Sequence, residues 1–327
     1  METTRRAFLL GRRPPETPWA AFLRRLRRGC EGGATVAAAS TGDSACLRPS
    51  SLIDVRVARE LCAEYGVVMA LAGTRATAPG RSCLWVDPQS LNTLRRLDDG
   101  LSAPASHWRA APGVTMAALA QAGLPQFAEL PAALTVAAWL AGREHAAASP
   151  GLASPPGLVC VDVMLADGAL ETLGPFGASG GVPLRSGTGQ ALIPALYTLS
   201  TRAGAAWCRA QGAWPGRYRL DALTPPPPAE ANLAGLLAGH EGALAWVDSV
   251  VLQAVAASDG GSQAGVVARA ALAPLRAPGP GISTGTAPGT ALAAAQPPSY
   301  AAEARALDAG IKDAFDPAGL YPDAPLP

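Results

Sequence analysis

The stretch from Glu60 to Gly80 constrains the fold most, because three kinds of local sequence follow one another in it. The end of a helical pattern leads into the apolar run Val67–Leu71, which predicts a buried strand, and then into a loop of small residues, Ala72–Gly80. Small side chains let a ligand approach the backbone, so the N–H groups of such a loop can bind one anion, for example a diphosphate. The alternative is an ordinary exit from a strand, and these residues alone do not distinguish the two.

Composition describes an ordinary folded chain with room for one large domain or two modest ones. The chain has 327 residues, 49% hydrophobic content and a formal net charge of +1. No basic stripe follows the first thirty residues, so nucleic-acid binding has little electrostatic support. The six cysteines form no Cys-x-x-Cys pair and no histidine stands at ligand spacing, which argues against a zinc or iron–sulfur site. Isolated cysteines in apolar runs are typical of a reduced, cytoplasmic protein.

The first thirty residues are rich in arginine. Thr4–Leu10 is similar to a twin-arginine export signal, but Gly11–Glu16 interrupts the apolar region that such a signal needs, so we expect the segment to remain and the protein to be cytoplasmic. Trp19–Arg28 has apolar and arginine positions at helical spacing. Such a helix could lie on an anionic membrane surface or on a partner, or it could be a solvated helix that covers the domain.

The remaining chain alternates predicted helices and strands. We expect a link over Cys30–Ser51, and later a polyproline boundary at Pro225–Pro228 and a flexible crossing over Pro274–Pro298. The Asp167-Gly168 pair between two apolar runs predicts a β-hairpin. The predicted helices are Val55–Tyr65, Val114–Ala122 with Thr115 as its cap, and Ala229–Leu237; the predicted strands are Cys83–Val86, His107–Ala110, Leu158–Leu165, Ala169–Leu173, Arg217–Arg219 and Ala243–Leu252.

This order of elements resembles a known flavoprotein family. The chain has, in order, a helix, a strand, a small-residue loop, a strand, a "Pro-Gly-Val-Thr" helix, a second small-residue run and a "Val-x-Val-x-Leu-Ala-Asp-Gly" hairpin. This order resembles the FAD-binding domain of the vanillyl-alcohol-oxidase (PCMH) type. The closing run with Lys312 and Phe315-Asp316-Pro317-Ala318-Gly319 is similar to the family's terminal motif. The resemblance covers roughly residues 50–200 and 300–323 and is greatest to the small FAD-binding subunit of glycolate oxidase.

The resemblance implies an α+β fold, with a two-subdomain FAD-binding domain over 46–222 after an Arg-rich segment, 1–45. A shortened α/β cap and crossing would occupy 223–299, and a helix in 300–327 would return to the FAD domain. FAD would be held by the two loops, at Gly73, Thr74, Arg75, Gly80, Thr135, Ala137 and Ala138. The function implied is oxidation of a 2-hydroxy acid to a 2-oxo acid, with a larger flavoprotein subunit and an iron–sulfur subunit as partners.

The sequence departs from the family at four places. Leu71 and Ala72 replace glycines of the first loop, and Thr135-Val136-Ala137-Ala138 stands where the family has "Thr-x-Gly-Gly". The family's "Gly-Ser-x-Gly-x-Leu-Gly" turn, expected after Gly189-Gln190-Ala191-Leu192, does not match Leu196–Gly204, and Tyr321 replaces a terminal asparagine. The alternative function is therefore a flavin-free relative that acts as a binding or assembly subunit.

Few residues suggest specific chemistry. Arg143 and His145 could supply a cation and a base to a substrate carboxylate, or could be solvated loop residues. Arg75 could pair with a phosphate or lie on the surface. His240 beside Glu241 could form an acid–base pair or a polar turn, while His107 beside Trp108 reads as a packing residue.

Overall fold

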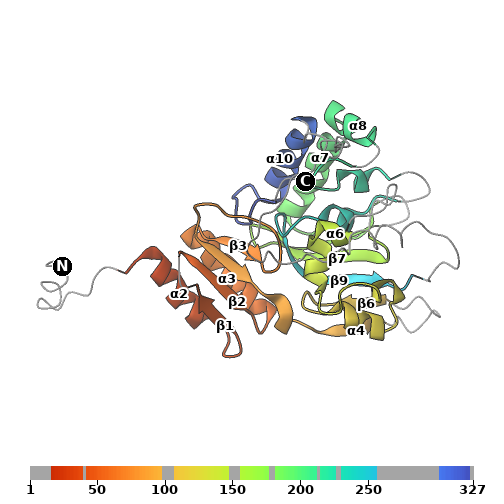
Figure 1. Cartoon of the computed structure of the whole chain (residues 1–327). Helices are drawn as coiled ribbons and strands as arrows, with labels where there is room; N and C mark the ends of the chain where they lie inside the picture. The colour runs from red at the N-terminus through yellow and green to blue at the C-terminus, as the bar shows by residue number, and fades with distance from the viewer. Residues whose placement is uncertain are drawn as a thin grey trace, which may run out of the picture.

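The computed structural model describes residues 16–39, 42–97, 107–146, 155–176, 181–211, 214–225, 230–255 and 302–324. Within these residues the chain forms two β-sheets with helices packed beside them (Figure 1). This arrangement confirms the α+β class. The part of the chain built on each sheet is called a subdomain below. The twin-arginine-like segment, residues 226–228 of the proline spacer and the crossing at 274–298 lie outside the described residues.

The first subdomain contains a four-stranded sheet in the order β1-β2-β4-β3. Its strands are β1 (Thr35–Ala38), β2 (Ser44–Arg48), β3 (Val68–Leu71) and β4 (Cys83–Val86). Strands β2 and β3 run parallel to β4, whereas β1 is antiparallel to β2. We expected residues 30–51 to form a link, and this prediction is wrong where β1 and β2 form. Ala45 and Leu47 of β2 alternate with more exposed neighbours and are buried in the core as strand residues.

Two helices accompany this sheet. Helix α3 (Leu52–Tyr65) begins with a capping box between Ser51 and Asp54 and ends at Gly66, which has φ +66°. Helix α2 (Pro18–Gly29) packs on α3 and buries Phe22 and Leu26 completely. Its apolar face is thus used inside the protein, and its arginines face outward. No helix among the described residues is long and apolar enough to cross a membrane.

The second subdomain contains an antiparallel sheet in the order β5-β6-β9-β7-β8. Its strands are β5 (Leu94–Leu97), β6 (His107–Ala110), β7 (Leu158–Met164), β8 (Leu170–Leu173) and β9 (Trp246–Gln253). The hairpin at Gly168 forms as expected, with φ +90° at the glycine. Strand β9 was expected in a separate cap but is the central strand here, because it hydrogen-bonds to both β6 and β7.

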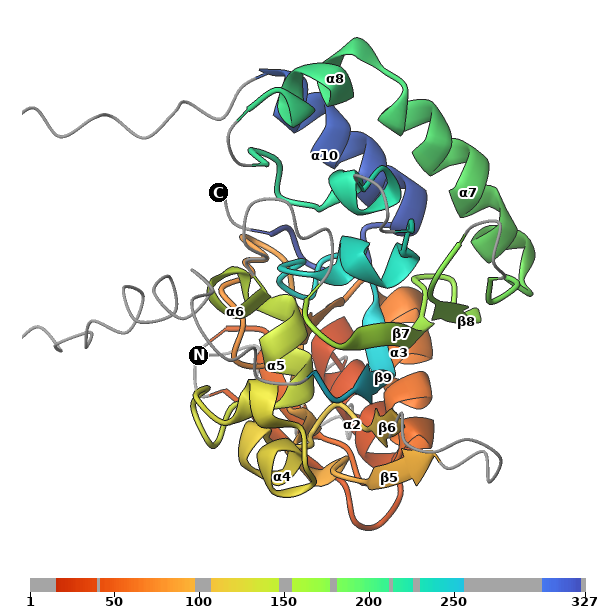
Figure 2. The same cartoon turned by 90° about the vertical axis from the view of Figure 1, so that its right-hand side faces the viewer.

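Helices cover the second sheet and one end of the molecule. The long helices α7 (Gly187–Ser200) and α10 (Ala302–Phe315) lie with α8 (Ala203–Arg209) at that end (Figure 2). Helix α7 and the turn after it occupy the residues where the family's flavin-lining turn was expected, so that turn does not form there. The shorter helices are α4 (Met116–Gln121), α5 (Val136–Ala141), α6 (Arg143–Ala146), η1 (Pro88–Ser90), η2 (Pro125–Phe127), η3 (Leu220–Leu223) and η4 (Leu233–Leu237).

Two further expectations near residue 220 are corrected. Residues 217–219 form no strand, because the backbone N–H groups of Arg217 and Tyr218 donate to the carboxylate of Asp308 on α10. The helix expected over 229–237 is reduced to η4, which starts where the Asn232 side chain accepts a hydrogen bond from Ala234 N.

Candidate functional site

Three segments far apart in the sequence meet between the two subdomains. They are the end of β3 with its following loop, 71–75; helix α5; and the turn 239–245 that precedes β9. The N–H groups of Gly239 and Glu241 donate to the carbonyls of Leu140 and Ala141, each at 2.8 Å. The first loop joins them through the Arg75 N–H, which donates to Glu241 Oε2 at 3.1 Å.

The turn 239–245 contains His240 and Glu241, but its likeness to the family's glycine-rich turn was not predicted. Its residues, Gly-His-Glu-Gly-Ala-Leu-Ala, match the spacing of the family pattern "Gly-Ser-x-Gly-x-Leu-Gly" at three of five fixed positions. Gly239 and Gly242 have φ +75° and +73°. A Cβ at Gly242 would lie 3.1 Å from Leu71 Cβ, so the close approach of the turn to the first loop requires glycine. Paired glycines before an apolar run were the signal available in the sequence.

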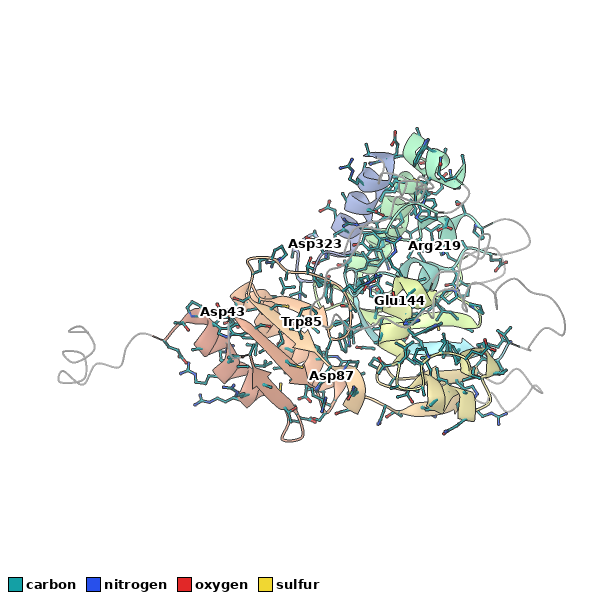
Figure 3. The ribbon with its side chains drawn as sticks, in the orientation of Figure 1. Asp43, Trp85, Asp87, Glu144, Arg219 and Asp323 are labelled. Carbon is teal, nitrogen blue, oxygen red and sulfur yellow. The ribbon has the colours of Figure 1, made fainter. Side chains whose placement is uncertain are left out.

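The first loop keeps part of the expected geometry. Gly73 and Gly80 have φ +87° and +71°, as a tight backbone loop requires. The Thr74 hydroxyl donates to the carbonyl of Leu71 at 2.9 Å. The Arg75 side chain is 63% exposed, and its guanidinium forms ion pairs with two carboxylates of the protein, Glu241 at 3.1 Å and Glu144 at 3.3 Å. Figure 3 shows Glu144 on the second subdomain, Trp85 on the first sheet and Asp87 just after the end of β4.

The second loop is a helix rather than a loop. Thr135 caps α5 by accepting from Ala138 N at 3.3 Å, and alanine favours the helical conformation that follows. The N–H of Ala137 donates to Pro112 O at 2.9 Å, and that of Val136 to Val114 O at 2.8 Å. These N–H groups therefore have protein acceptors and do not point together at an external anion.

Side chains fill the space where the three segments meet. Residues from all three segments, together with β9 and the C-terminal segment, surround a cavity of only about 10 Å³. This volume holds about one water molecule, whereas pockets for small ligands span about 300–1,000 Å³. The lining residues are Met69, Leu71, Ala137, His240, Gly242, Ala245, Trp246, Val247 and Tyr321. The residues present here do not fit FAD, the group that the family resemblance implies.

Two of the lining side chains are large aromatic rings, those of Trp246 and Tyr321. Trp246 and Tyr321 are 4% and 3% exposed and belong to one apolar cluster with Leu71 and Ala137. The Tyr321 hydroxyl donates to the carbonyl of Met164 at 2.9 Å, which fixes its ring. Burial raises the pKa of Tyr321 well above its ordinary value, so the phenol stays protonated.

His240 and Glu241 do not form an acid–base pair. Glu241 is buried, has φ +53°, and directs its carboxylate to Arg75. His240 is buried, and neither ring nitrogen has a hydrogen-bond partner among the described residues. Burial, and next the charge of Lys312, lowers the pKa of His240 to about 3, so the imidazole is neutral at physiological pH.

Arg143 and His145 lie on α6 and do not line this cavity. Arg143 donates to the carbonyl of Gly216 at 3.2 Å, and burial lowers its pKa. The Nε2 atom of His145 lies 3.7 Å from Glu144 Oε1. His107 is half-buried in β6, opposite Gln253 of β9. The described residues contain no group of three or more histidine, cysteine or acidic side chains arranged to hold a metal ion.

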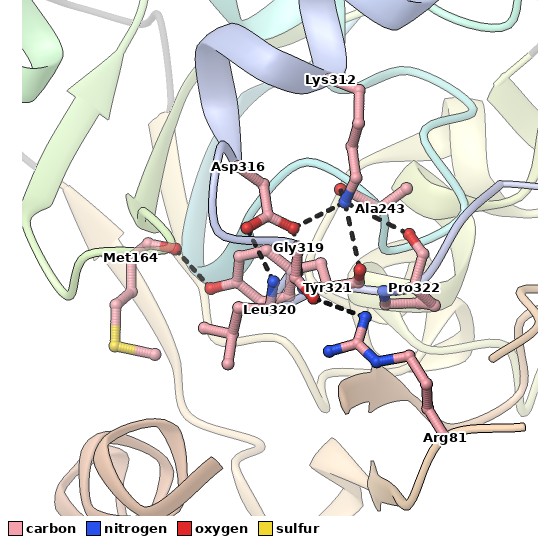
Figure 4. Close-up of polar contacts among 9 residues, drawn as sticks. All are labelled: Arg81, Met164, Ala243, Lys312, Asp316, Gly319, Leu320, Tyr321 and Pro322. Atoms are coloured by element: carbon pink, nitrogen blue, oxygen red, sulfur yellow. Dashed lines mark hydrogen bonds and ion pairs between the residues drawn. The ribbon is translucent and has the colours of Figure 1, made fainter. Parts of the chain in front are cut away.

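The terminal motif has a structural role at this site (Figure 4). The Lys312 amine donates to the carbonyl of Ala243 at 2.7 Å, to the Asp316 carboxylate at 2.6 Å and to the carbonyl of Tyr321 at 3.1 Å. Asp316 also accepts from the N–H groups of Leu320 and Tyr321, each at 2.8 Å. These bonds hold the C-terminal segment against the turn 239–245 and keep the Tyr321 ring in the cavity wall.

Comparison with known proteins finds similarity only among solved structures. No protein-family model matches the chain, and no curated protein matches it. The chain is 14% identical to 4-ethylphenol oxidase from Gulosibacter chungangensis in its isoeugenol complex, with a TM-score of 0.41 over 73% of this chain and 43% of that one. It is 13% identical to alkyldihydroxyacetonephosphate synthase, with a TM-score of 0.41 over 76% of this chain and 42% of that one. It is 14% identical to cholesterol oxidase from B. sterolicum, with a TM-score of 0.36 over 64% of this chain and 34% of that one.

The chain thus spans less than half the length of each of these three structures. Similarity at this level assigns neither a cofactor nor a substrate.

Proposed function

We propose that this chain is a flavin-free protein with the architecture of an FAD-binding domain, and that it works as a binding or assembly subunit rather than as an oxidoreductase. The observation that supports this most directly is the cavity of about 10 Å³ between Leu71, Ala137 and Trp246, where a dinucleotide would need several hundred Å³. The N–H groups of Arg75, Ala137 and Ala138 also have protein acceptors. A flavin would have to displace both the packing and these hydrogen bonds.

By family analogy, the partner in such an assembly would be a larger flavoprotein subunit, together with an iron–sulfur subunit that accepts electrons. In that arrangement the partner would carry the flavin chemistry. The present chain would supply a folded surface.

A second candidate is an FAD-linked oxidoreductase subunit acting on a 2-hydroxy acid, of the glycolate or D-lactate type. The observation in its favour is the meeting of the three segments, with positive φ at Gly73, Gly239 and Gly242. The buried His240 ring also has no hydrogen-bond partner among the residues that the structure describes. This candidate requires the side chains of Trp246 and Tyr321 to leave the cavity, because both line it.

A flavin titration distinguishes the two. The full chain is purified, incubated with excess FAD, freed of unbound ligand by gel filtration, and scanned for visible flavin absorbance before and after denaturation. We expect no flavin band and no FAD released on denaturation. Flavin retained at a ratio near one per chain would overturn the proposal in favour of the oxidoreductase.

A further inference from the structure

A second, much larger hollow is lined by residues of both subdomains. This groove has a volume of about 700 Å³, within the range of small-molecule sites. One wall is the start of α3, Ser50–Leu52, and another comes from residues 90–93, which connect the two sheets. Its floor is formed by strands of the five-stranded sheet, and none of its lining residues also lines the closed cavity.

Two carboxylates in the groove are already used by the fold. Asp162 of β7 accepts from the hydroxyls of Thr172 at 2.7 Å and Ser249 at 2.6 Å, and forms an ion pair with Arg109. Glu171 of β8 accepts from the backbone N–H of Arg185 at 3.0 Å and that of Ser186 just before α7. Both side chains hold the floor and one wall in place, and neither has much capacity left for a ligand.

Asp248 differs from these two. A register shift between β7 and β9 leaves Asp248 as the extra residue between the pairs Asp162–Ser249 and Val163–Val247, and its side chain lines the groove. Such bulges change the direction of a side chain and are frequent beside functional sites. The side chain is 12% exposed, and its one ion pair among the described residues is with Arg56 at 4.0 Å, the limit for such a contact.

The Asp248 carboxylate is therefore costly to the fold. Burial raises its pKa from 3.8 to about 6; Arg56 and the Trp246 indole reduce this rise, and Asp162 adds to it. Arg56 and the Trp246 indole thus offset the cost of burying this charge only in part, and a ligand group that supplies a positive charge or hydrogen-bond donors would stabilise it further.

One guanidinium of the same groove has no partner among the described residues. Arg95 on β5 is exposed, lies opposite Arg109 of β6 in the sheet register, and makes no hydrogen bond or ion pair with the rest of the described chain. The groove thus carries a weakly paired carboxylate on β9 and, two strands away on β5, a guanidinium with no partner among the described residues.

We infer that the groove binds a small zwitterion of the amino-acid or short-peptide class, with the ligand's ammonium group at Asp248 and its carboxylate at Arg95. A zwitterion carries one group of the right charge for each of these side chains. In the wall, the Thr93 hydroxyl can hydrogen-bond to the ligand's polar backbone, and the Ser50 hydroxyl, which donates to Asp54, can still accept. The inference is independent of the proposed function, since it concerns a different set of residues.

Three matched peptides test the ligand class on the full chain by isothermal titration calorimetry. Glycylglycine carries both charges, N-acetylglycylglycine lacks the ammonium, and glycylglycinamide lacks the carboxylate. We expect glycylglycine to bind, and removal of either charge to weaken binding at least about tenfold, the effect of losing one charge-assisted hydrogen bond. Equal binding of the three peptides would overturn the inference, as would no binding of glycylglycine or triglycine at about 10 mM.

Paired variants test the two side chains. Asp248→Asn and Arg95→Gln are each expected to weaken glycylglycine binding at least about tenfold. Glu129→Gln and Arg27→Gln make the same charge changes at exposed positions outside the groove, and are expected to leave binding unchanged. Loss of binding in a control equal to that in its partner variant would contradict the inference.

The Asp248 variant also reports on its own folding. Because asparagine has no charge to bury, Asp248→Asn is expected to unfold at a higher temperature than the wild type. A variant that is more stable but no longer binds glycylglycine would separate the role of this carboxylate from folding.

Discussion

At the scale of single residues, Trp246 decides what the space between the subdomains can hold. Trp246 is the first residue of β9, and its indole packs in one apolar cluster with Leu71, Ala137 and Tyr321. A smaller side chain at this position would leave a hollow between the three converging segments. The same side chain thus stabilises the closed junction and excludes a dinucleotide from it.

Replacing Trp246 by alanine should destabilise the protein by about 3–5 kcal/mol, because the change removes a buried aromatic ring and leaves a cavity. Urea unfolding followed by circular dichroism measures this difference. Trp207→Ala on α8 is the control, since its side chain is 38% exposed and the loss should stay below about 1 kcal/mol. Equal losses in the two variants would show that the junction is not tightly packed around Trp246.

At the scale of elements, the start of α3 depends on one carboxylate. Asp54 is buried and accepts from the N–H of Glu31 at 2.7 Å, from the N–H and hydroxyl of Ser50, each at 2.8 Å, and from the N–H of Ser51 at 3.0 Å. Burial acts to raise the pKa of Asp54, but these four donors outweigh it and the pKa is lowered below 3.8. The carboxylate therefore ties α3 to the chain that follows α2.

Asp54→Ala should cost about 2–3 kcal/mol near neutral pH, because four donors lose a charged acceptor. A depressed pKa stabilises the fold above the unfolded value near 3.8, and this contribution is lost as pH falls through the lower folded value. The difference in unfolding free energy between wild type and variant should therefore shrink below about pH 4. Asp43→Asn, at the exposed residue labelled in Figure 3, should show neither effect. A difference independent of pH would contradict this account.

Local signals predicted the elements well, and pairing between distant segments explains the failures. Strands β4 and β6 and the Thr115 cap follow from apolar runs and cap chemistry, and form where expected. Helix α5 was read as a loop because the family has glycines there, although alanines after a capping threonine favour a helix. The central position of β9 depends on partners 80 or more residues away, such as Asp162 for Ser249, which no local pattern reveals.

The candidate site was predicted only in part. Residues 71–75 and 135–138 do approach one junction, and Gly73 and Gly80 have the expected backbone. The filling of that junction by Trp246 and Tyr321 follows from tertiary packing. The groove around Asp248 arises from a bulge and from the meeting of two subdomains, neither of which has a sequence signature.

At the scale of the whole molecule, the C-terminal segment connects the two subdomains. The carbonyl of Leu320 accepts from Met69 N of β3 at 2.9 Å, while the Tyr321 hydroxyl reaches Met164 O of β7. Lys312 holds this segment in place through Ala243 O and the Asp316 carboxylate. One buried amine thus supports contacts to both sheets.

Lys312→Met should cost about 3–5 kcal/mol, because it leaves the buried Asp316 carboxylate without its cation. Hydrogen exchange at the amides of Leu320 and Tyr321 should also accelerate, since their acceptor Asp316 loses its anchor. Asp313→Asn, one position further along α10 and exposed, should change neither measurement. Unchanged exchange at Leu320 in the lysine variant would show that the segment is held by other contacts.

Lys312 is also the sole lysine of the chain, and its side chain is only 17% exposed. Four oxygen acceptors surround its nitrogen, so a reagent that acylates amines cannot reach a lone pair there without displacing them. In the folded protein, amine-directed reagents and enzymes that modify lysine therefore have no accessible side-chain amine to react with. An acylated Lys312 would mark a molecule whose C-terminal segment had detached from the turn 239–245.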